Sequence, residues 1–388
     1  MGRRRRIGAA AVCALLCTLA AWPAAAGAYT KQTFSVPVTQ PDEFGNAVSL
    51  DTDVYLPDGA APAGGWPLVE VFHGGGSDKA NAFDAGHAAF FADHGYAALI
   101  YSQRGHGDSG GQTTVAGPKE MHDVFDVTGW ALDRFPLDPA RIALTGYSQG
   151  GLNTNLAQVN AGDPAVNPRG IRFAALEPGN TPDVTFEALV PNQVVKLSFG
   201  VGLVETYLVG THSRQAPIVD KWIATAVADQ PALYGGDVCD ATGHDTSTST
   251  MKQDLAARSV GCFAERMTPP NLWAQAFDDG LFPPDMAISM WRRMPASERR
   301  LYLSMGGHAA PAAAPAVEKD KLDQQLALLD HVFKGTALRG PAVVYWTRDP
   351  AIDVPNDSYQ YPDGAWYRQT SASWPPPRTA DVTYQLWS

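Results

Sequence analysis

Short apolar runs typical of buried strands alternate along this 388-residue chain with longer stretches of helical periodicity. Helices are expected over Met121–Phe135 and Glu318–Lys334, and Gly335 follows the second as a stop signal. The expected strands are Val48–Leu56 (half exposed), Leu68–Phe72, Ala97–Tyr101, Ile142–Thr145, Phe173–Leu176, Leu272–Ala276 and Leu301–Met305. This alternation predicts an α/β fold, a mostly parallel central sheet with helices on both faces.

Two regions interrupt the alternation. Between the fifth and sixth expected strands the chain loses its strand–loop–helix rhythm and carries amphipathic stretches, which predicts an inserted helical cap. Near its end the chain is rich in Pro, Thr and aromatic residues, with expected strands at Val343–Trp346 and Val382–Leu386. The expected divisions are a core (29–180 and 269–339), a cap (181–268) and a β-rich C-terminal segment (340–388).

The first 28 residues have the features of an export signal. Arg3–Arg6 precede an apolar stretch at Ile7–Ala21, and Ala26–Ala28 resembles a cleavage site. The apolar stretch is short for a membrane span. Removing residues 1–28 takes away four of 29 basic residues and none of 40 acidic ones, which changes the net charge from −11 to −15. We therefore expect a secreted, extracellular protein that is not held in a membrane after signal cleavage.

Charge and cysteine content narrow the classes of function. The acidic balance argues against a nucleic-acid binder, which needs a basic surface. After signal cleavage Cys239 and Cys262 are the two remaining cysteines, and an oxidising compartment favours a disulfide worth about 3 kcal/mol between them. A free reactive thiol is the alternative. The sequence carries no HExxH, CxxC or comparable metal-ligand spacing, and we expect neither a metal nor a cofactor.

A nucleophilic serine is expected at Ser148. The segment Gly146–Gly150 matches G-x-S-x-G directly after an expected strand, where a sharp turn into a helix projects the serine hydroxyl. The same pattern occurs at Gly107–Gly111, which looks like the nucleophile segment of trypsin-type proteases. Those enzymes place their serine late in the chain, after the histidine and the aspartate, so Ser109 is expected to be a loop residue.

The other parts of a hydrolytic site follow in order along the chain. The glycine-rich loop after the strand Leu68–Phe72 predicts an oxyanion hole built from the backbone N–H groups of Gly74, Gly75 and Gln149. His308 follows the last expected core strand and is the expected base. Asp279 is the expected carboxylate, with Asp278 as the alternative. The order Ser148, Asp279, His308 is that of an α/β-hydrolase.

The motifs resemble α/β-hydrolases of the X-prolyl dipeptidyl-peptidase and cocaine-esterase type. They are His73–Gly76, Gln103–Gly110, Gly146–Gly150, Asp279–Pro283, Gly307–His308, Leu329–Gly335, Trp366 and Trp374–Pro376. The resemblance implies the same serine, aspartate and histidine as a triad, and ester bonds or amide bonds after proline as substrates. It also implies a C-terminal β-sandwich, which we expect to be truncated here because about 48 residues follow Gly340.

The sequence departs from this family's pattern at two positions. Ser102 stands where an Asp usually precedes the Arg of the second motif. The loop Gly74–Gly76 lacks the Tyr that often lends a hydroxyl to the oxyanion hole, which leaves the second donor open.

A secreted serine hydrolase acting through an acyl-enzyme is the favoured function, as a broad esterase that cleaves small-molecule esters. An X-Pro dipeptidyl-peptidase acting on peptides is the first alternative. The second is a non-catalytic binding protein on a hydrolase fold. The natural substrate and the oligomeric state stay open.

Overall fold

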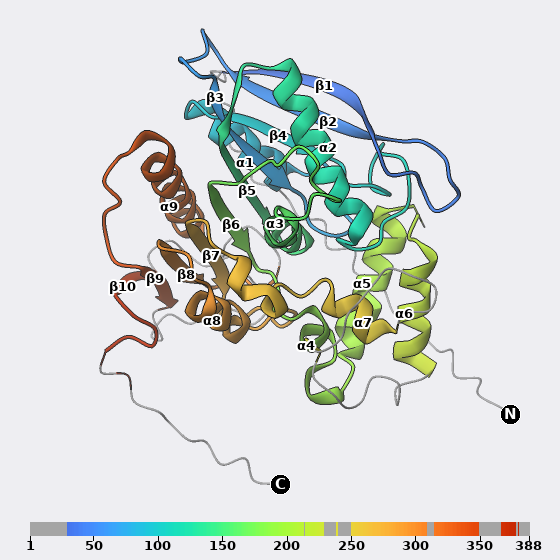
Figure 1. Ribbon diagram of the computed structural model, residues 1–388. Coiled ribbons are helices and arrows are strands. Elements are labelled where there is room, and N and C mark those ends of the chain that lie inside the picture. Colours follow the sequence, from blue (N-terminus) through green and yellow to red (C-terminus); the bar gives the residue numbers. More distant parts are fainter. Residues whose placement is uncertain are drawn as a thin grey trace, which may run out of the picture.

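A single ten-stranded sheet forms the centre of the molecule (Figure 1). The computed structural model describes residues 29–212, 214–228, 238–239, 250–308, 314–348, 366–377 and 379. The strands are β1 (Tyr29–Val38), β2 (Val48–Pro57), β3 (Trp66–Phe72), β4 (Ala97–Tyr101), β5 (Leu137–Tyr147), β6 (Ala175–Gly179), β7 (Asn271–Ala276), β8 (Arg299–Ser304), β9 (Val343–Arg348) and β10 (Trp366–Ser371). The expected signal segment and the expected strand at Val382–Leu386 lie outside the described residues.

The strands are ordered β1-β2-β4-β3-β5-β6-β7-β8-β9-β10. All neighbours from β4 to β9 pair in parallel, whereas β1, β2 and β10 join their neighbours antiparallel. The carboxyl ends of the parallel strands therefore meet at one edge of the sheet, where ligands bind in open α/β sheets. The predicted mostly parallel sheet is confirmed.

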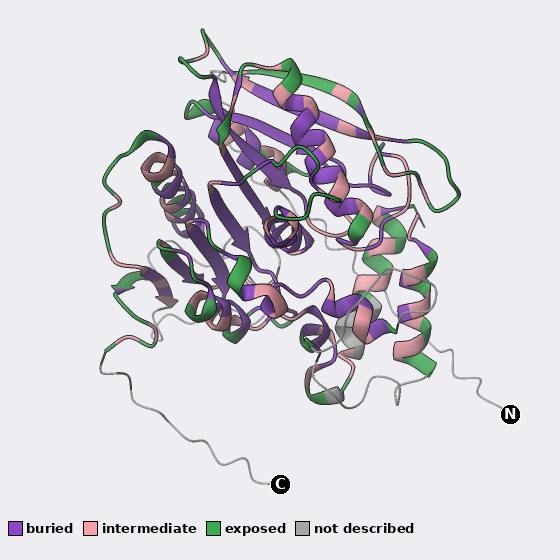
Figure 2. Ribbon diagram, in the orientation of Figure 1, coloured by how far each residue is buried: buried purple, intermediate pink, exposed green. Residues whose placement is uncertain are grey.

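Helices cover both faces of the sheet, as expected. Helices α2 (Pro118–Arg134), α3 (Gln149–Asn160) and α8 (Pro284–Arg293) share one apolar core with the sheet, and α1 (Ala82–Asp93) and α9 (Pro315–Lys334) share another. The strands between the two layers are buried along most of their length (Figure 2). Within the part of the chain that the structure describes, no helix has the length and hydropathy to span a membrane.

Two sequence-based expectations about the sheet need correction. Strand β2 is mostly buried and not half exposed, because Leu50 and Val54 pack into one core while Tyr55 packs into the other. Strand β9, expected in a separate C-terminal segment, pairs with β8 and extends the central sheet, and β10 extends it further. Both differences arise because the burial of β2 and the pairing of β9 depend on contacts with segments that are distant in the sequence.

The chain between β6 and β7 carries short helical elements, of which α4, α5, α6 and α7 lie together beside the sheet (Figure 1). The elements are α4 (Thr185–Leu189), η1 (Pro191–Gln193), α5 (Leu197–Gly210), α6 (Pro217–Ala228), α7 (Met251–Ala256) and η3 (Val260–Arg266). Helices α4, α6 and α7 bury an apolar cluster of their own around Phe186, Trp222 and Leu255, whereas η3 packs on α3 and α8. A disulfide joins Cys239 to Cys262, as expected. We call this helical region the cap.

A carboxyl group is buried in the middle of the sheet without a hydrogen-bond partner among the described residues. Glu177 of β6 is 1% exposed, and neither of its carboxyl oxygens is bonded. Burial raises the pKa of Glu177 to about 8. The folded protein therefore keeps this proton at pH values where the unfolded chain, with a pKa of about 4.3, has released it. This difference makes stability depend on pH.

Glu177→Gln should stabilise the protein increasingly as the pH rises. The wild type loses stability between about pH 4.5 and 8, because the unfolded state binds fewer protons there than the folded state. The neutral amide removes this loss, which amounts to on the order of 4 kcal/mol over the window. The measurement is Tm from thermal unfolding at pH 5 and pH 9. The Tm of the variant minus that of the wild type should be roughly 5 °C higher at pH 9 than at pH 5. The exposed Glu187→Gln is the control, and a pH-independent difference for Glu177→Gln would contradict the prediction.

Candidate active site

Ser148 lies at the sharp turn between β5 and α3. It is the N-cap of α3 with φ 58° and ψ −123°, a conformation that is strained for a residue with a side chain. Glycines on both sides permit the turn, since a Cβ on Gly146 would lie 2.6 Å from the backbone of Gly150, and one on Gly150 would overlap the Phe72 carbonyl. The structure therefore gives the predicted G-x-S-x-G segment the geometry of a nucleophile elbow.

His308 reaches Ser148 from the loop after β8. Its Nε2 lies 2.8 Å from Ser148 Oγ, and its Nδ1 lies 2.9 Å from Asp279 Oδ2. Because a carboxylate only accepts hydrogen bonds, the proton belongs on Nδ1, which leaves Nε2 free to accept the serine proton. The His308 side chain is 25% exposed, so the ring is accessible from outside. The structure thus brings the three predicted residues into one hydrogen-bonded chain.

The two neighbouring aspartates after β7 have separate roles. Asp279 is fully buried: its Oδ1 accepts the N–H groups of Leu281 and Phe282, both at 2.9 Å, so that Oδ2 faces His308. Asp278 Oδ1 instead accepts the N–H groups of Gly306 and Gly307, at 3.0 and 2.9 Å. Asp279 therefore orients the ring of His308, and Asp278 holds the loop that carries it.

Ser109 of the second G-x-S-x-G segment is a buried loop residue. It is 0% exposed, its Oγ donates to the Ser102 carbonyl, and it accepts the Asp51 N–H at 2.8 Å. The first bond joins Ser109 to the start of its own loop, and the second ties that loop to β2. The hydroxyl of Ser109 therefore makes structural hydrogen bonds, as its position in the sequence suggests.

The glycine-rich loop after β3 lies next to Ser148. A Cβ on Gly74 would be 3.7 Å from Ser148 Cβ. Burial raises the pKa of Asp84 on α1 to about 8, and a backbone hydrogen bond from Gly74 partly offsets this rise. Gln149 is the first residue of α3, where backbone N–H groups have no partner within the helix.

Two buried histidines support this loop. Burial lowers the pKa of His73 to about 3 and that of His106 to about 4, so both rings stay neutral. A neutral ring nitrogen can accept a hydrogen bond. His73 Nε2 accepts the Gln103 N–H at 2.9 Å, and His106 Nε2 accepts the Gly76 N–H at 3.3 Å. As hydrogen-bond acceptors, they shape the loop.

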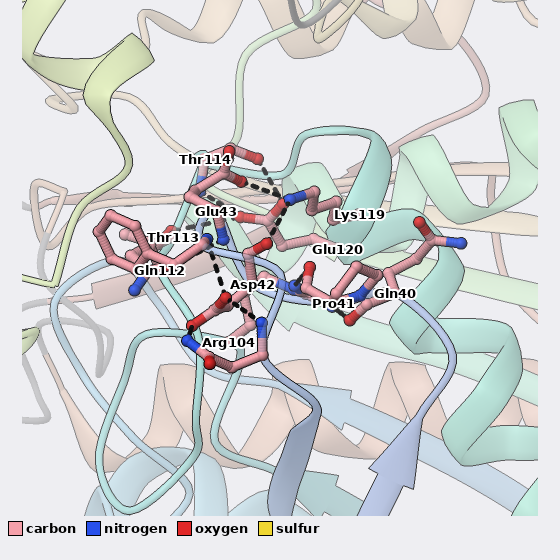
Figure 3. A network of polar contacts seen from close by, with 12 residues as sticks. Gln40, Pro41, Asp42, Glu43, Arg104, Gln112, Thr113, Thr114, Lys119 and Glu120 are labelled. Atoms are coloured by element: carbon pink, nitrogen blue, oxygen red, sulfur yellow. Dashed lines mark hydrogen bonds and ion pairs between the residues drawn. The ribbon is translucent and has the colours of Figure 1, made fainter.

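The loop after β4 is fixed to the core by a buried arginine (Figure 3). Arg104 is 0% exposed and binds both carboxylate oxygens of Asp123 on α2, at 2.8 and 2.7 Å. Its remaining donors reach the carbonyl oxygens of Gln40 and Pro41, each at 3.1 Å. Glu120 accepts from the backbone N–H and hydroxyl of Thr114 farther along the loop. The segment 104–116 is therefore a rigid platform.

The cap is anchored on this platform by two arginines. Arg214 donates to the carbonyl oxygens of Gly107 and Ser109. Arg258 Nε donates to the Thr114 and Val115 carbonyls at 3.1 and 3.0 Å. These contacts place the cap helices relative to the nucleophile elbow.

Sequence reasoning missed two cap residues that contact the site. Lys196 donates to the carbonyl oxygens of Gly280 and Leu281, at 3.2 and 3.0 Å, and so holds the loop of Asp279. Tyr207 of α5 donates to the Gln149 side-chain oxygen. Neither belongs to a motif, although a tyrosine within the apolar segment 197–210 is a weak signal. Among the described residues, no three His, Cys, Asp or Glu side chains are arranged to hold a metal ion.

A protein-family comparison matches most of this chain. The model described as X-Pro dipeptidyl-peptidase (S15 family) matches residues 45–310, a range that includes Ser148, Asp279 and His308. No curated protein matches the sequence.

Solved structures share the fold at low sequence identity. A CocE/NonD family hydrolase from Staphylococcus aureus is 12% identical with a TM-score of 0.58, over 90% of this chain and 57% of its own. A puromycin hydrolase is 17% identical with a TM-score of 0.53, over 79% and 40%. An acetyl xylan esterase from Paenibacillus sp. R4 is 16% identical with a TM-score of 0.50, over 79% and 89%. The chain spans 57% of the length of the Staphylococcus hydrolase, and these likenesses confirm the predicted α/β-hydrolase fold.

Proposed function

This chain belongs to the X-Pro dipeptidyl-peptidase (S15) family, as its motifs predicted, and from this premise we propose that it is a serine hydrolase with Ser148 as nucleophile. The observation that carries the proposal is the hydrogen-bonded chain Ser148–His308–Asp279, which starts at a strained elbow. We favour a broad esterase or acyl hydrolase over a proline-directed peptidase.

The geometry supports a two-step reaction through an acyl-enzyme. Ser148 Oγ attacks the carbonyl carbon and its proton passes to His308 Nε2, which then protonates the leaving alcohol or amine as the bond to it breaks. Water attacks the acyl-enzyme, gives its proton to His308, and releases the acid as Ser148 regains its proton. Asp279 holds the required tautomer of His308 throughout.

The oxyanion that forms in each step needs donors beside Ser148. We propose the backbone N–H groups of Gln149, at the start of α3, and of Gly75, in the glycine-rich loop after β3. Each such donor is typically worth about 3–4 kcal/mol in the transition state.

The surroundings of His308 support an apolar substrate group. The Phe282 ring lies 5.0 Å from the His308 ring and belongs to an apolar cluster with Leu281, Met286 and Leu203 of the cap. The members of this cluster that remain partly exposed, such as Leu203, offer hydrocarbon surface that an apolar substrate group can cover with a gain in free energy. This favours esters with an apolar acyl or alcohol group.

A dipeptidyl-peptidase must also hold a free substrate amine, which requires a carboxylate in the pocket. In the described part of the cap, the buried acids are engaged elsewhere: Asp183 accepts the Val184 N–H at 2.7 Å and Asp254 accepts Trp222 Nε1–H at 2.8 Å. The other described cap acids, Glu187, Glu205, Asp220 and Glu265, are exposed. This supports the esterase over the peptidase.

Export is part of the same proposal. The disulfide between Cys239 and Cys262 supports it, because disulfides persist in oxidising compartments.

Comparing nitrophenyl esters with X-Pro nitroanilides tests the substrate class. We expect kcat/KM for short and medium acyl esters to exceed that for the anilides by at least about 100-fold, because the apolar wall binds the acyl group while the amine finds no partner. Initial rates on both series with the full chain provide the measurement. An excess of X-Pro anilide hydrolysis, lost when the substrate amine is acetylated, would favour the peptidase.

A further inference from the structure

Helix α5 of the cap packs directly on the glycine-rich loop after β3. A Cβ on Gly76 would lie 2.5 Å from Thr206 Cγ2, and one on Gly210 would overlap the Gly76 carbonyl. Glycine on both sides thus allows the backbones of loop and helix to touch. The position of α5 and the shape of this loop are therefore linked.

Tyr207 brings a hydroxyl to the centre of this contact. A Cβ on Gly75 would overlap the Tyr207 hydroxyl, and it would lie 3.0 Å from Gln149 Oε1. Gly75 is not among the glycines with positive φ, so the neighbouring side chains and not the backbone conformation disfavour a side chain there. The hydroxyl donates to Gln149 Oε1.

The contact continues into a buried polar chain beneath the loop. Gln149 Nε2 donates to Gln103 Oε1 at 2.6 Å, and Gln103 Nε2 donates to the His73 carbonyl at 2.7 Å. Gln149, Gln103 and His73 are 5%, 1% and 0% exposed. A fully connected buried network holds its members in one arrangement. Tyr207 is the member of this chain that the cap supplies.

We propose that Tyr207 is a positioning residue for the oxyanion hole, which is complete only when α5 is seated on the loop. Its hydroxyl fixes the side chain of Gln149, whose backbone N–H is one proposed donor, and its ring lies against Gly75, which carries the other. The cap thereby controls the rate of the chemical step as well as the shape of the pocket. This inference rests on the proposed serine hydrolase activity.

Tyr207→Phe keeps the ring and removes the hydroxyl. We expect kcat for a nitrophenyl ester to fall by about 10- to 100-fold with KM changed less than about 3-fold, since a misplaced donor weakens transition-state binding. Affinity for an alkyl boronic acid, which forms a tetrahedral adduct with the serine, should fall in parallel with kcat/KM. Leu208→Ala, an exposed neighbour on α5, is the matched control and should leave both values near those of the wild type.

Gly75→Ala tests the contact from the other side. In the wild-type background the added Cβ should displace the Tyr207 hydroxyl and lower kcat. In the Tyr207→Phe background Gly75→Ala should lower kcat by a smaller factor, because the two changes disturb one contact. Unchanged kcat and boronate affinity in Tyr207→Phe, or fully additive losses, would overturn the inference while wild-type activity stands. A wild type that is not labelled at Ser148 would instead overturn the proposed function itself.

Discussion

Ser148→Ala should abolish ester hydrolysis, lowering kcat by on the order of 10⁶-fold, and should abolish covalent labelling by a fluorophosphonate probe. Without the hydroxyl no acyl-enzyme forms, because residue 148 then has neither an oxygen to attack the substrate nor a proton to give to His308. The measurement is gel fluorescence of the labelled protein together with initial rates on a nitrophenyl ester.

Ser109→Ala is the matched control, because Ser109 lies in the same G-x-S-x-G pattern. It should keep its labelling and activity at temperatures where it is folded. Losing a buried hydroxyl with two hydrogen bonds should lower its free energy of unfolding by about 1–3 kcal/mol. Labelling that persists in Ser148→Ala would refute the assignment of the nucleophile. A folded wild type that is never labelled would favour a non-catalytic binding protein.

Asp279→Asn should lower kcat by about 10⁴-fold at neutral pH. The N–H groups of Leu281 and Phe282 both bind Oδ1, so they should hold the amide oxygen of asparagine at that position. The NH₂ group then replaces Oδ2 and donates to His308 Nδ1, which moves the ring proton to Nε2. In that tautomer the ring cannot accept the proton of Ser148. The measurement is kcat across pH 6–9.

Asp278→Asn is the comparison that separates the two aspartates. Its amide oxygen can still accept the N–H groups of Gly306 and Gly307, so kcat should fall by less than about tenfold. An equal or larger loss in Asp278→Asn than in Asp279→Asn would reverse the roles that we assign to them.

The sequence predicted the parts of the molecule that depend on local patterns. Strand β4 was predicted with its observed bounds and β3 within two residues, because short runs of buried apolar residues end in glycine-rich loops. The positions of Ser148, Asp279 and His308 followed from the same rule, since each comes directly after a parallel strand and such strands end at one edge of the sheet.

Features that depend on contacts between distant segments could not be predicted. The role of Tyr207 requires knowing that α5 packs on Gly75 and Gly76, residues more than 100 positions earlier. Strand β9 resembles any edge strand until its pairing with β8 is known. Burial distinguishes Ser109 from a nucleophilic serine, and this burial depends on the hydrogen bond from the Asp51 N–H.

The anchoring of the cap by Arg214 and Arg258 limits how this enzyme can be redesigned. Both arginines bind backbone carbonyls of the segment 104–116, so the receiving surface is set by the path of that loop and not by replaceable side chains. A cap transplanted from a related hydrolase to alter substrate preference would meet carbonyls in positions that its own residues do not match. The loop after β4 and the cap should therefore be exchanged as a single unit.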